Sequence, residues 1–248
     1  PKGMTIDALK ERGYTTVPKR GWIPVTVPGQ PKAWAALSRR FGKLGLKEVL
    51  QPAIHYAKEG YPLSPVAAYL WKKYVEKNTP LFQKDAAFQE WFRVFTKEGR
   101  PYEFGDIVKF PDHARTLELI AESDGEVFYH GEIADAIEKQ SRRDHGLIEK
   151  SDLEAYDVEW VEPISVNYRG YDVWEIPPNG QGIVTLMALN ILKNFDFVNK
   201  EDAETYHRQF EAIKYAFSDA LATVTDSRDM KVDVRKLLTD AYGKERAA

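Results

Sequence analysis

The sequence has no cysteine among its 248 residues. Disulfide bonds, thiolate metal sites and a cysteine nucleophile are therefore excluded from this chain. The compartment stays open, because a chain without cysteine is compatible with an oxidising or a reducing environment.

The sequence also lacks an excess of charge of one sign, since 35 Lys and Arg residues oppose 38 Asp and Glu residues for a formal net charge of −3. No dense basic stripe matches a phosphate backbone, so nucleic acid is not an expected partner. The chain has no run of 18 apolar residues, and its N-terminal stretch has the pattern of neither a signal peptide nor a membrane anchor. We therefore expect no membrane partner.

Apolar residues are abundant enough for a core, because 43% of the chain is hydrophobic and 12% is aromatic. A globular body is the expected result. The chain begins at Pro1 and not at a methionine, from which we expect a processed or truncated product.

The spacing of apolar residues predicts helices over most of the chain. Prolines, a capping serine and glycines mark several of their ends. The predicted helices cover residues 31–42, 46–59 with an interruption at Pro52, 65–78 with Ser64 as the cap, 86–95, 112–123, 132–140, 182–194, 201–226 and 234–246.

β-Branched and aromatic residues alternate on both sides of the sequence YRGY, residues 168–171, which predicts a two-stranded hairpin. Many helices with one hairpin indicate an α+β class, and the hairpin is expected to join strands that lie elsewhere. The expected organisation is a single domain, 1–248. It has an extended entry segment at 1–30, a helical region at 31–155, and the hairpin with further helices at 156–248.

Histidines and carboxylates give no clear catalytic signal. No two of the five histidines have the i, i+4 spacing of metal ligands, so no metal site is predicted; they are His55, His113, His130, His145 and His207. The carboxylate pairs Asp152/Glu154 and Asp202/Glu204 could serve as acid and base, but such residues are also expected at helix starts and on solvated faces.

The sequence PPNGQG, residues 177–182, connects the hairpin to a helix. The two prolines should keep the strand exit extended, and Gly180 and Gly182 are expected to adopt conformations closed to other residues. The turn lacks the glycine patterns of phosphate-binding loops. Free backbone N–H groups at the start of the helix could bind an anion or a carbonyl oxygen. A ligand site and a plain connecting turn therefore both stay open.

Four stretches of the chain resemble, in order, the large subunit of the γ-glutamyltransferase (γ-glutamyltranspeptidase, glutathione hydrolase) family. They are VPGQPKAWAALSRRFGKLGLKEVLQPAIHYAKEGYPLS, FPDHARTLELIAESDGEVFYHGEIADAI, EPISVNYRGYDVWEIPPNGQGIVTLMALNILKNFDF and EAIKYAFSDA. The resemblance covers about residues 27–246 and corresponds to the central and C-terminal part of that subunit.

Two departures point to the acylase-like branch of the family, which includes cephalosporin and glutaryl acylases. The turn reads Asn179-Gly180-Gln181-Gly182 where the better-known transferases have Ser-Ser-Gly-Gly. Ala220 stands where the family pattern has an arginine after the aspartate Asp219. The preferred acyl group and acceptor are therefore left open.

The resemblance implies an N-terminal-nucleophile hydrolase, an αββα sandwich that is incomplete in this chain and that cuts itself into two subunits. A threonine at the start of the small subunit would attack a γ-glutamyl or glutaryl amide, with its own amine as base and backbone N–H groups holding the oxyanion. The acyl group would pass to water or to the amine of an amino acid or peptide. The implied partner is the small subunit of the same precursor, and no cofactor is implied.

The implied nucleophile is not in this chain, so the chain alone is expected to be inactive. Thr185, Thr223 and Thr225 are interpreted as packing residues, and the arginine of the family's R-E-x-A-P motif would lie just before Pro1. The resemblance implies that the turn of Asn179, Gly180, Gln181 and Gly182 shapes the substrate pocket. A cytoplasmic location is preferred over a periplasmic or secreted one, because the acylase-like branch includes proteins without signals.

Two other functions are compatible with the sequence. The aromatic residues Phe88, Trp91, Phe92 and Phe95 could grip a protein, which would make the chain a non-catalytic helical interaction module. The second alternative is a self-sufficient hydrolase that uses an Asp/Glu pair for catalysis.

Overall fold

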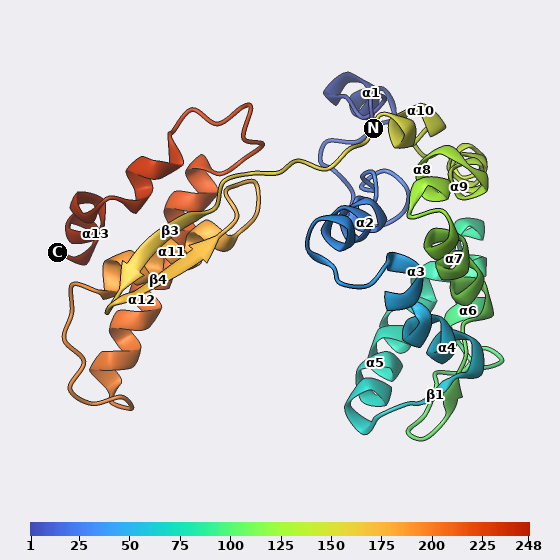
Figure 1. Cartoon of the computed structure of the whole chain (residues 1–248), viewed down its shortest axis with the longest axis horizontal. Coiled ribbons are helices and arrows are strands. Elements are labelled where there is room, and N and C mark those ends of the chain that lie inside the picture. The colour runs from blue at the N-terminus through green and yellow to red at the C-terminus, as the bar shows by residue number, and fades with distance from the viewer. The chain divides into compact units, whose positions relative to one another are not determined.

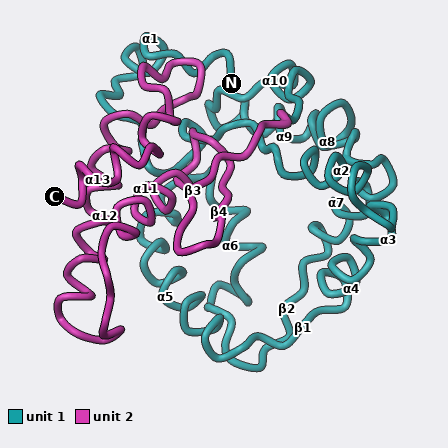
Figure 2. The backbone as a smooth tube through the Cα atoms, turned by 60° about the vertical axis from the view of Figure 1, so that its left-hand side comes forward, with its two compact units in different colours: residues 1–158 teal, residues 159–248 magenta.

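The computed structural model describes all residues from Pro1 to Ala248, which form two compact units, Pro1–Val158 and Glu159–Ala248 (Figures 1 and 2). This boundary lies close to residue 156, where the sequence analysis divides the helical region from the hairpin part. The grouping of both parts into a single domain stays a prediction.

The regular elements of the first unit are helices and two short strands, which pair antiparallel with Tyr61 opposite Val108. Its elements are α1 (Ile6–Glu11), α2 (Gln30–Phe41), α3 (Leu46–Val49), α4 (Gln51–Glu59), β1 (Tyr61–Pro62), α5 (Pro65–Phe82), the 3₁₀ helix η1 (Ala86–Phe88), α6 (Gln89–Phe95), β2 (Ile107–Val108), α7 (Pro111–Glu122), α8 (Glu126–His130), α9 (Glu132–Arg143) and α10 (Lys150–Glu154).

The predicted helices of this unit are confirmed, except that the first three residues of 86–95 form the 3₁₀ helix η1. The predicted helix 46–59 is divided at Leu50 into α3 and α4, with Pro52 in the first turn of α4, where its missing N–H costs no helical hydrogen bond. Ser64 caps α5 by accepting a hydrogen bond from the Ala67 N–H at 3.3 Å. Within segment 1–30, which the sequence analysis treats as extended, the structure has α1.

The buried core of the first unit forms several clusters. One joins α2, α3, α4 and α7 through Ala35, Leu46, Ile54 and Ile120. Another surrounds Tyr129, whose hydroxyl donates to the Pro28 carbonyl at 2.7 Å. That hydrogen bond satisfies the polar end of a fully buried aromatic side chain.

The aromatic residues around α6 pack within the same unit. Phe88 stacks on buried Phe82 at a centroid distance of 4.1 Å, and Trp91 meets Phe82 edge to face at 5.1 Å. The Trp71 indole N–H, on α5, donates to the Phe95 carbonyl at 2.8 Å. These residues therefore join α5 to α6 and are partly buried in that contact.

The second unit contains one hairpin and four helical elements. Its elements are β3 (Ile164–Tyr168), β4 (Tyr171–Glu175), α11 (Gly182–Leu192), α12 (Ala203–Thr223), the 3₁₀ helix η2 (Val234–Leu238) and α13 (Asp240–Ala247). The predicted hairpin is confirmed, with Tyr168 opposite Tyr171. Arg169 and Gly170 both have positive φ, 53° and 88°, as a two-residue turn of the type I′ class requires.

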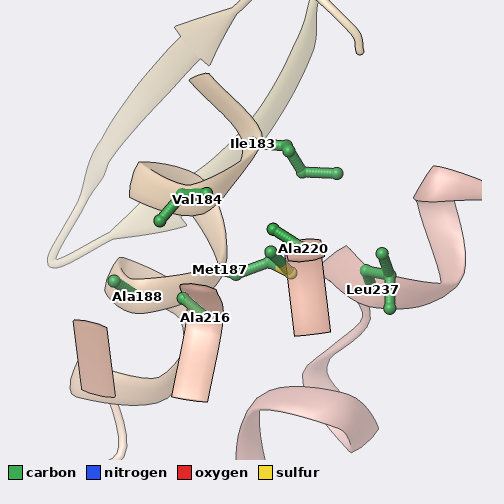
Figure 3. Packing of buried hydrophobic residues seen from close by; sticks show 7 residues of the cluster. All are labelled: Ile183, Val184, Met187, Ala188, Ala216, Ala220 and Leu237. Atoms are coloured by element: carbon green, nitrogen blue, oxygen red, sulfur yellow. The ribbon is translucent and has the colours of Figure 1, made fainter. Parts of the chain in front are cut away.

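Helix α11 is the centre of the second unit (Figure 3). Eight of its eleven residues are buried, so neighbouring elements cover most of its surface. Ile183, Leu186 and Met187 are fully buried, and Ala216 and Ala220 on α12 let the two helices approach closely. The predicted helix 234–246 is in fact two elements, because Thr239 ends η2 and caps α13 by accepting from the Tyr242 N–H.

No helix of the structure combines the length and the apolar character that a membrane crossing needs. No group of three or more His, Asp and Glu side chains is arranged to hold a metal ion.

Candidate substrate site

The turn between β4 and α11 presents two free polar side chains. Asn179 and Gln181 are exposed, and neither side chain makes a hydrogen bond within the protein. Pro178, by contrast, is buried and anchors the turn to the unit. The arrangement holds an amide on each side of Gly180, where a ligand could use both.

The glycines of this turn serve a different purpose from the one predicted. Neither Gly180 nor Gly182 has a positive φ, so the expectation that both adopt conformations closed to other residues is wrong. A Cβ on Gly180 would meet no atom within 4 Å. A Cβ on Gly182 would overlap the Glu175 side chain, lying 2.8 Å from its Cδ and 3.0 Å from its Cβ. Gly182 therefore leaves room for the Glu175 side chain, which would have to turn away from a methyl group at this position.

Glu175, the last residue of β4, brings its carboxylate beside the first turn of α11. The N–H groups of Gly182 and Ile183 have no protein acceptor, and the first bond of that turn joins the Val184 N–H to the Gln181 carbonyl at 2.9 Å. A negative charge at this position is favourable, because helix N-termini carry partial positive charge. An anionic ligand at this helix start would have to share the space with Glu175.

We expect the substitution Gly182→Ala to lower the free energy of unfolding by about 1 kcal/mol, because the new methyl group displaces the Glu175 side chain from the start of α11. Gly180→Ala is the matched control and should change that free energy by less than about 0.5 kcal/mol. Combining Gly182→Ala with Glu175→Ala should recover most of the loss, measured as hydrogen exchange of the α11 amides. Equal protection of α11 in Gly182→Ala and Gly180→Ala proteins would contradict the steric role.

Behind α11, a charged network joins α12 to α13. The Asp219 carboxylate accepts from the Tyr242 hydroxyl at 2.5 Å and from Arg246 Nε and Nη2 at 2.8 and 2.9 Å. Burial and the bond to Asp219 raise the pKa of Tyr242 to about 12. Ala220, which replaces the arginine of the family pattern, is buried against α11, so the cation beside Asp219 comes from Arg246.

None of the three threonines singled out from the sequence has a base in reach. Thr185 and Thr225 are exposed and make no side-chain hydrogen bond, so the prediction that they pack in the interior is wrong. The Thr223 hydroxyl donates to the Asp219 carbonyl at 2.6 Å, a bond within its own helix. A hydroxyl in such a setting is not activated as a nucleophile.

One carboxylate of each acidic pair, Asp152 or Asp202, stabilises a helix start. Asp152 is buried, and although burial raises its pKa, the backbone N–H groups of Lys2 and Glu149 hold that pKa below its usual value. The Asp202 carboxylate accepts from the Thr205 N–H at 2.7 Å, which also lowers its pKa. Both carboxylates accept hydrogen bonds from backbone N–H groups at helix starts, and neither is placed to act as a catalytic acid or base.

The whole chain, residues 1–248, matches the family model for gamma-glutamyltranspeptidase. A glutathione hydrolase-like proenzyme of Bacillus subtilis (strain 168) is 34% identical over 99% of the chain and 46% of its own length. An acylase proenzyme, ACY 1, of Pseudomonas sp. (strain V22) is 34% identical over 90% of the chain and 39% of its own length. The chain thus spans less than half the length of these curated relatives.

Solved structures agree with this result. The cephalosporin acylase from Bacillus halodurans is 48% identical and superposes on all of the chain with a TM-score of 0.95, the chain covering 46% of that protein. The Helicobacter pylori gamma-glutamyltranspeptidase is 28% identical, with a TM-score of 0.84 over 94% of the chain and 66% of its own chain. The resemblance and the fold class inferred from the sequence are confirmed: the chain belongs to the γ-glutamyltranspeptidase family of N-terminal-nucleophile hydrolases and has the helix-rich fold of part of the large subunit.

Proposed function

We propose that the complete protein is a self-processing amidase and acyltransferase that acts on γ-glutamyl or glutaryl amides. An N-terminal threonine of the small subunit takes up the acyl group and passes it to water or to the amine of an amino acid or peptide. The chain described here supplies part of the large subunit, without the nucleophile. The 48% identity to a cephalosporin acylase over the full chain is the observation that carries this proposal.

The hairpin supports a role for the small subunit as partner. Ile164, on the face that includes Val166, packs against the α11 cluster, whereas Trp174 and Ile176 point to the opposite face and are 60% and 63% exposed. Large apolar side chains on the outer face of a lone hairpin indicate a surface that another layer covers. We infer that the remainder of the precursor supplies this layer.

Expression of the full-length precursor tests the proposed activity. We expect its intact mass to resolve into two fragments, and the processed protein to hydrolyse γ-glutamyl-p-nitroanilide or glutaryl-p-nitroanilide. The preferred substrate of the two identifies the acyl group. A single uncut polypeptide without turnover of either amide would contradict the proposal.

In the processed enzyme we assign Asn179 and Gln181 to the substrate pocket, with Gly180 and Gly182 shaping the turn. The double substitution Asn179→Ala and Gln181→Ala should lower kcat/KM about tenfold, since two amide hydrogen bonds to the substrate are each worth about 1 kcal/mol or less. The loss should fall mainly on KM, because these groups bind and do not react.

Gln83→Ala provides a control for this substitution, because Gln83 is also exposed and its side chain makes no hydrogen bond. It should leave both kcat and KM unchanged. Steady-state kinetics with the preferred amide compare the three proteins. If the double variant keeps the wild-type kcat/KM, the turn lies outside the pocket.

A further inference from the structure

The first unit contains a wide groove of about 1240 Å³, formed by three separate segments. They are residues 12–23 after α1, residues 81–88 at the end of α5 and in η1, and residues 142–146 at the end of α9. This volume exceeds the 300–1,000 Å³ or so that is typical of small-molecule pockets. The groove therefore offers room for a ligand larger than a single metabolite.

Positive charge is concentrated along the groove, although the chain as a whole has a net charge of −3. Five cationic side chains line it against only two carboxylates, Asp85 and Asp144; the cations are Arg12, Lys19, Arg20, Arg142 and Arg143. The groove is thus a basic strip on a weakly acidic protein, and a ligand attracted to it must be anionic.

Three of the five cations have no carboxylate partner. Lys19 and Arg20 are exposed and unpaired, and Arg12 Nη1 donates only to the His145 carbonyl, at 2.7 Å. Arg142 and Arg143 are partly neutralised, since they pair with Glu138 at 3.0 Å and with Asp144 at 2.9 Å. The arginine side of each pair is exposed, so Arg142 and Arg143 still add positive potential beside the three unpaired cations.

The two carboxylates of the groove are already engaged and do not oppose an anion strongly. Asp144 accepts from Arg143 and from the Trp22 indole N–H at 3.1 Å, and the bonds from Arg143 hold its pKa below the usual value. Asp85 Oδ1 accepts from the Ala87 N–H at 2.9 Å and caps η1. Each carboxylate therefore interacts with a neighbouring group in the groove wall.

We propose that this groove binds an extended acidic peptide, whose carboxylates are held by Arg12, Lys19 and Arg20. Guanidinium groups bind carboxylates through paired N–H donors, and lysine adds a point charge. Trp22 and Phe88 add partly buried aromatic surface to the lining, on which the apolar parts of a peptide can rest. A nucleic acid is less suited, because its uniform charge would extend beyond the strip over a net acidic surface. This site is independent of the proposed amidase activity.

Fluorescence anisotropy of labelled hexaglutamate, titrated with the full-length protein at low ionic strength, tests the proposal. We expect saturable binding that weakens as salt is added, because exposed ion pairs are screened. The double substitution Lys19→Ala and Arg20→Ala should weaken binding about tenfold. The matched control, Lys43→Ala with Lys47→Ala, removes the same charge from exposed positions outside the groove and should bind as the wild type does.

A charge-reversed variant, Lys19→Glu with Arg20→Glu, should lose hexaglutamate binding and gain affinity for hexalysine. Circular dichroism of each variant checks that the helices remain folded. The proposal is overturned by absent hexaglutamate binding, or by equal losses in the groove and control variants. Tighter binding of a thymidine hexanucleotide than of hexaglutamate, with the same dependence on Lys19 and Arg20, would instead assign the groove to nucleic acid and overturn the peptide.

Discussion

We expect the substitution Gly243→Ala to lower the free energy of unfolding of the second unit by about 3 kcal/mol. A Cβ at this position on α13 would lie 2.5 Å from the backbone carbonyl oxygen of Asn190 on α11, and 3.0 Å from its Cγ and Nδ2. The nearest obstacle is backbone, so no side-chain rotation relieves the overlap. Helix α13 must therefore move away from α11.

The estimate combines three effects of that movement. Overpacking against backbone costs about 3 kcal/mol, the upper end of its usual range. The hydrogen bond from Asn190 Nδ2 to the Thr239 carbonyl, 2.8 Å long and fully buried on the Asn190 side, contributes about 1 kcal/mol and is lost. Alanine gains about 1 kcal/mol over glycine in helix propensity, which offsets the second effect.

Hydrogen exchange of the α11 amides measures this change within the second unit, whatever the stability of the first. Gly180→Ala is again the control, since Gly180 has open space around it and no positive φ. Wild-type protection of α11 in the Gly243→Ala protein would show that α13 does not depend on this close approach.

Elements that are long or carry their own turn chemistry were predictable from the sequence. The hairpin follows from alternation around YRGY and from a glycine that takes a left-handed conformation at no cost. Helix α11 follows from eleven consecutive residues that are mostly apolar. Helices α1, α8 and α10 were missed because five or six residues are too few to show a helical period.

The parts of the candidate site that were not predictable depend on contacts between distant residues. The role of Gly182 depends on where the turn places the Glu175 side chain, and a glycine pattern alone suggested backbone freedom instead. Asp219 and Arg246 are 27 residues apart and meet only because α13 folds back beside α12. The basic groove combines three segments that have no unusual charge density when each is considered alone.

The network around Asp219 gives the second large effect. We expect Asp219→Ala to lower the free energy of unfolding of the second unit by about 3 kcal/mol. The hydrogen bond from the Tyr242 hydroxyl to a carboxylate is worth about 2 kcal/mol, and the bidentate pair with Arg246 about 1 kcal/mol, because the Arg246 side chain is 37% exposed and screened by water. Asp219→Asn should fall between the two proteins, since it keeps an acceptor but not the charge.

The pH dependence of stability distinguishes the contribution of Tyr242 from that of Asp219. The pKa of Tyr242, about 12 in the folded protein, is above its ordinary value of about 10, so this group adds stability that is complete below pH 10 or so and is lost as the pH rises toward about 12. Asp219→Ala removes two of the three causes that raise this pKa, the hydrogen bond to the carboxylate and the charge of the carboxylate, and leaves burial. The pKa of Tyr242, followed by the absorbance of tyrosinate, should therefore fall in Asp219→Ala while hydrogen exchange of the α11 amides becomes faster.

A double-mutant cycle that combines Asp219→Ala with Tyr242→Phe should give a coupling free energy of about 1–2 kcal/mol. Additive losses would mean that Tyr242 and Asp219 stabilise the unit separately, each through its own packing.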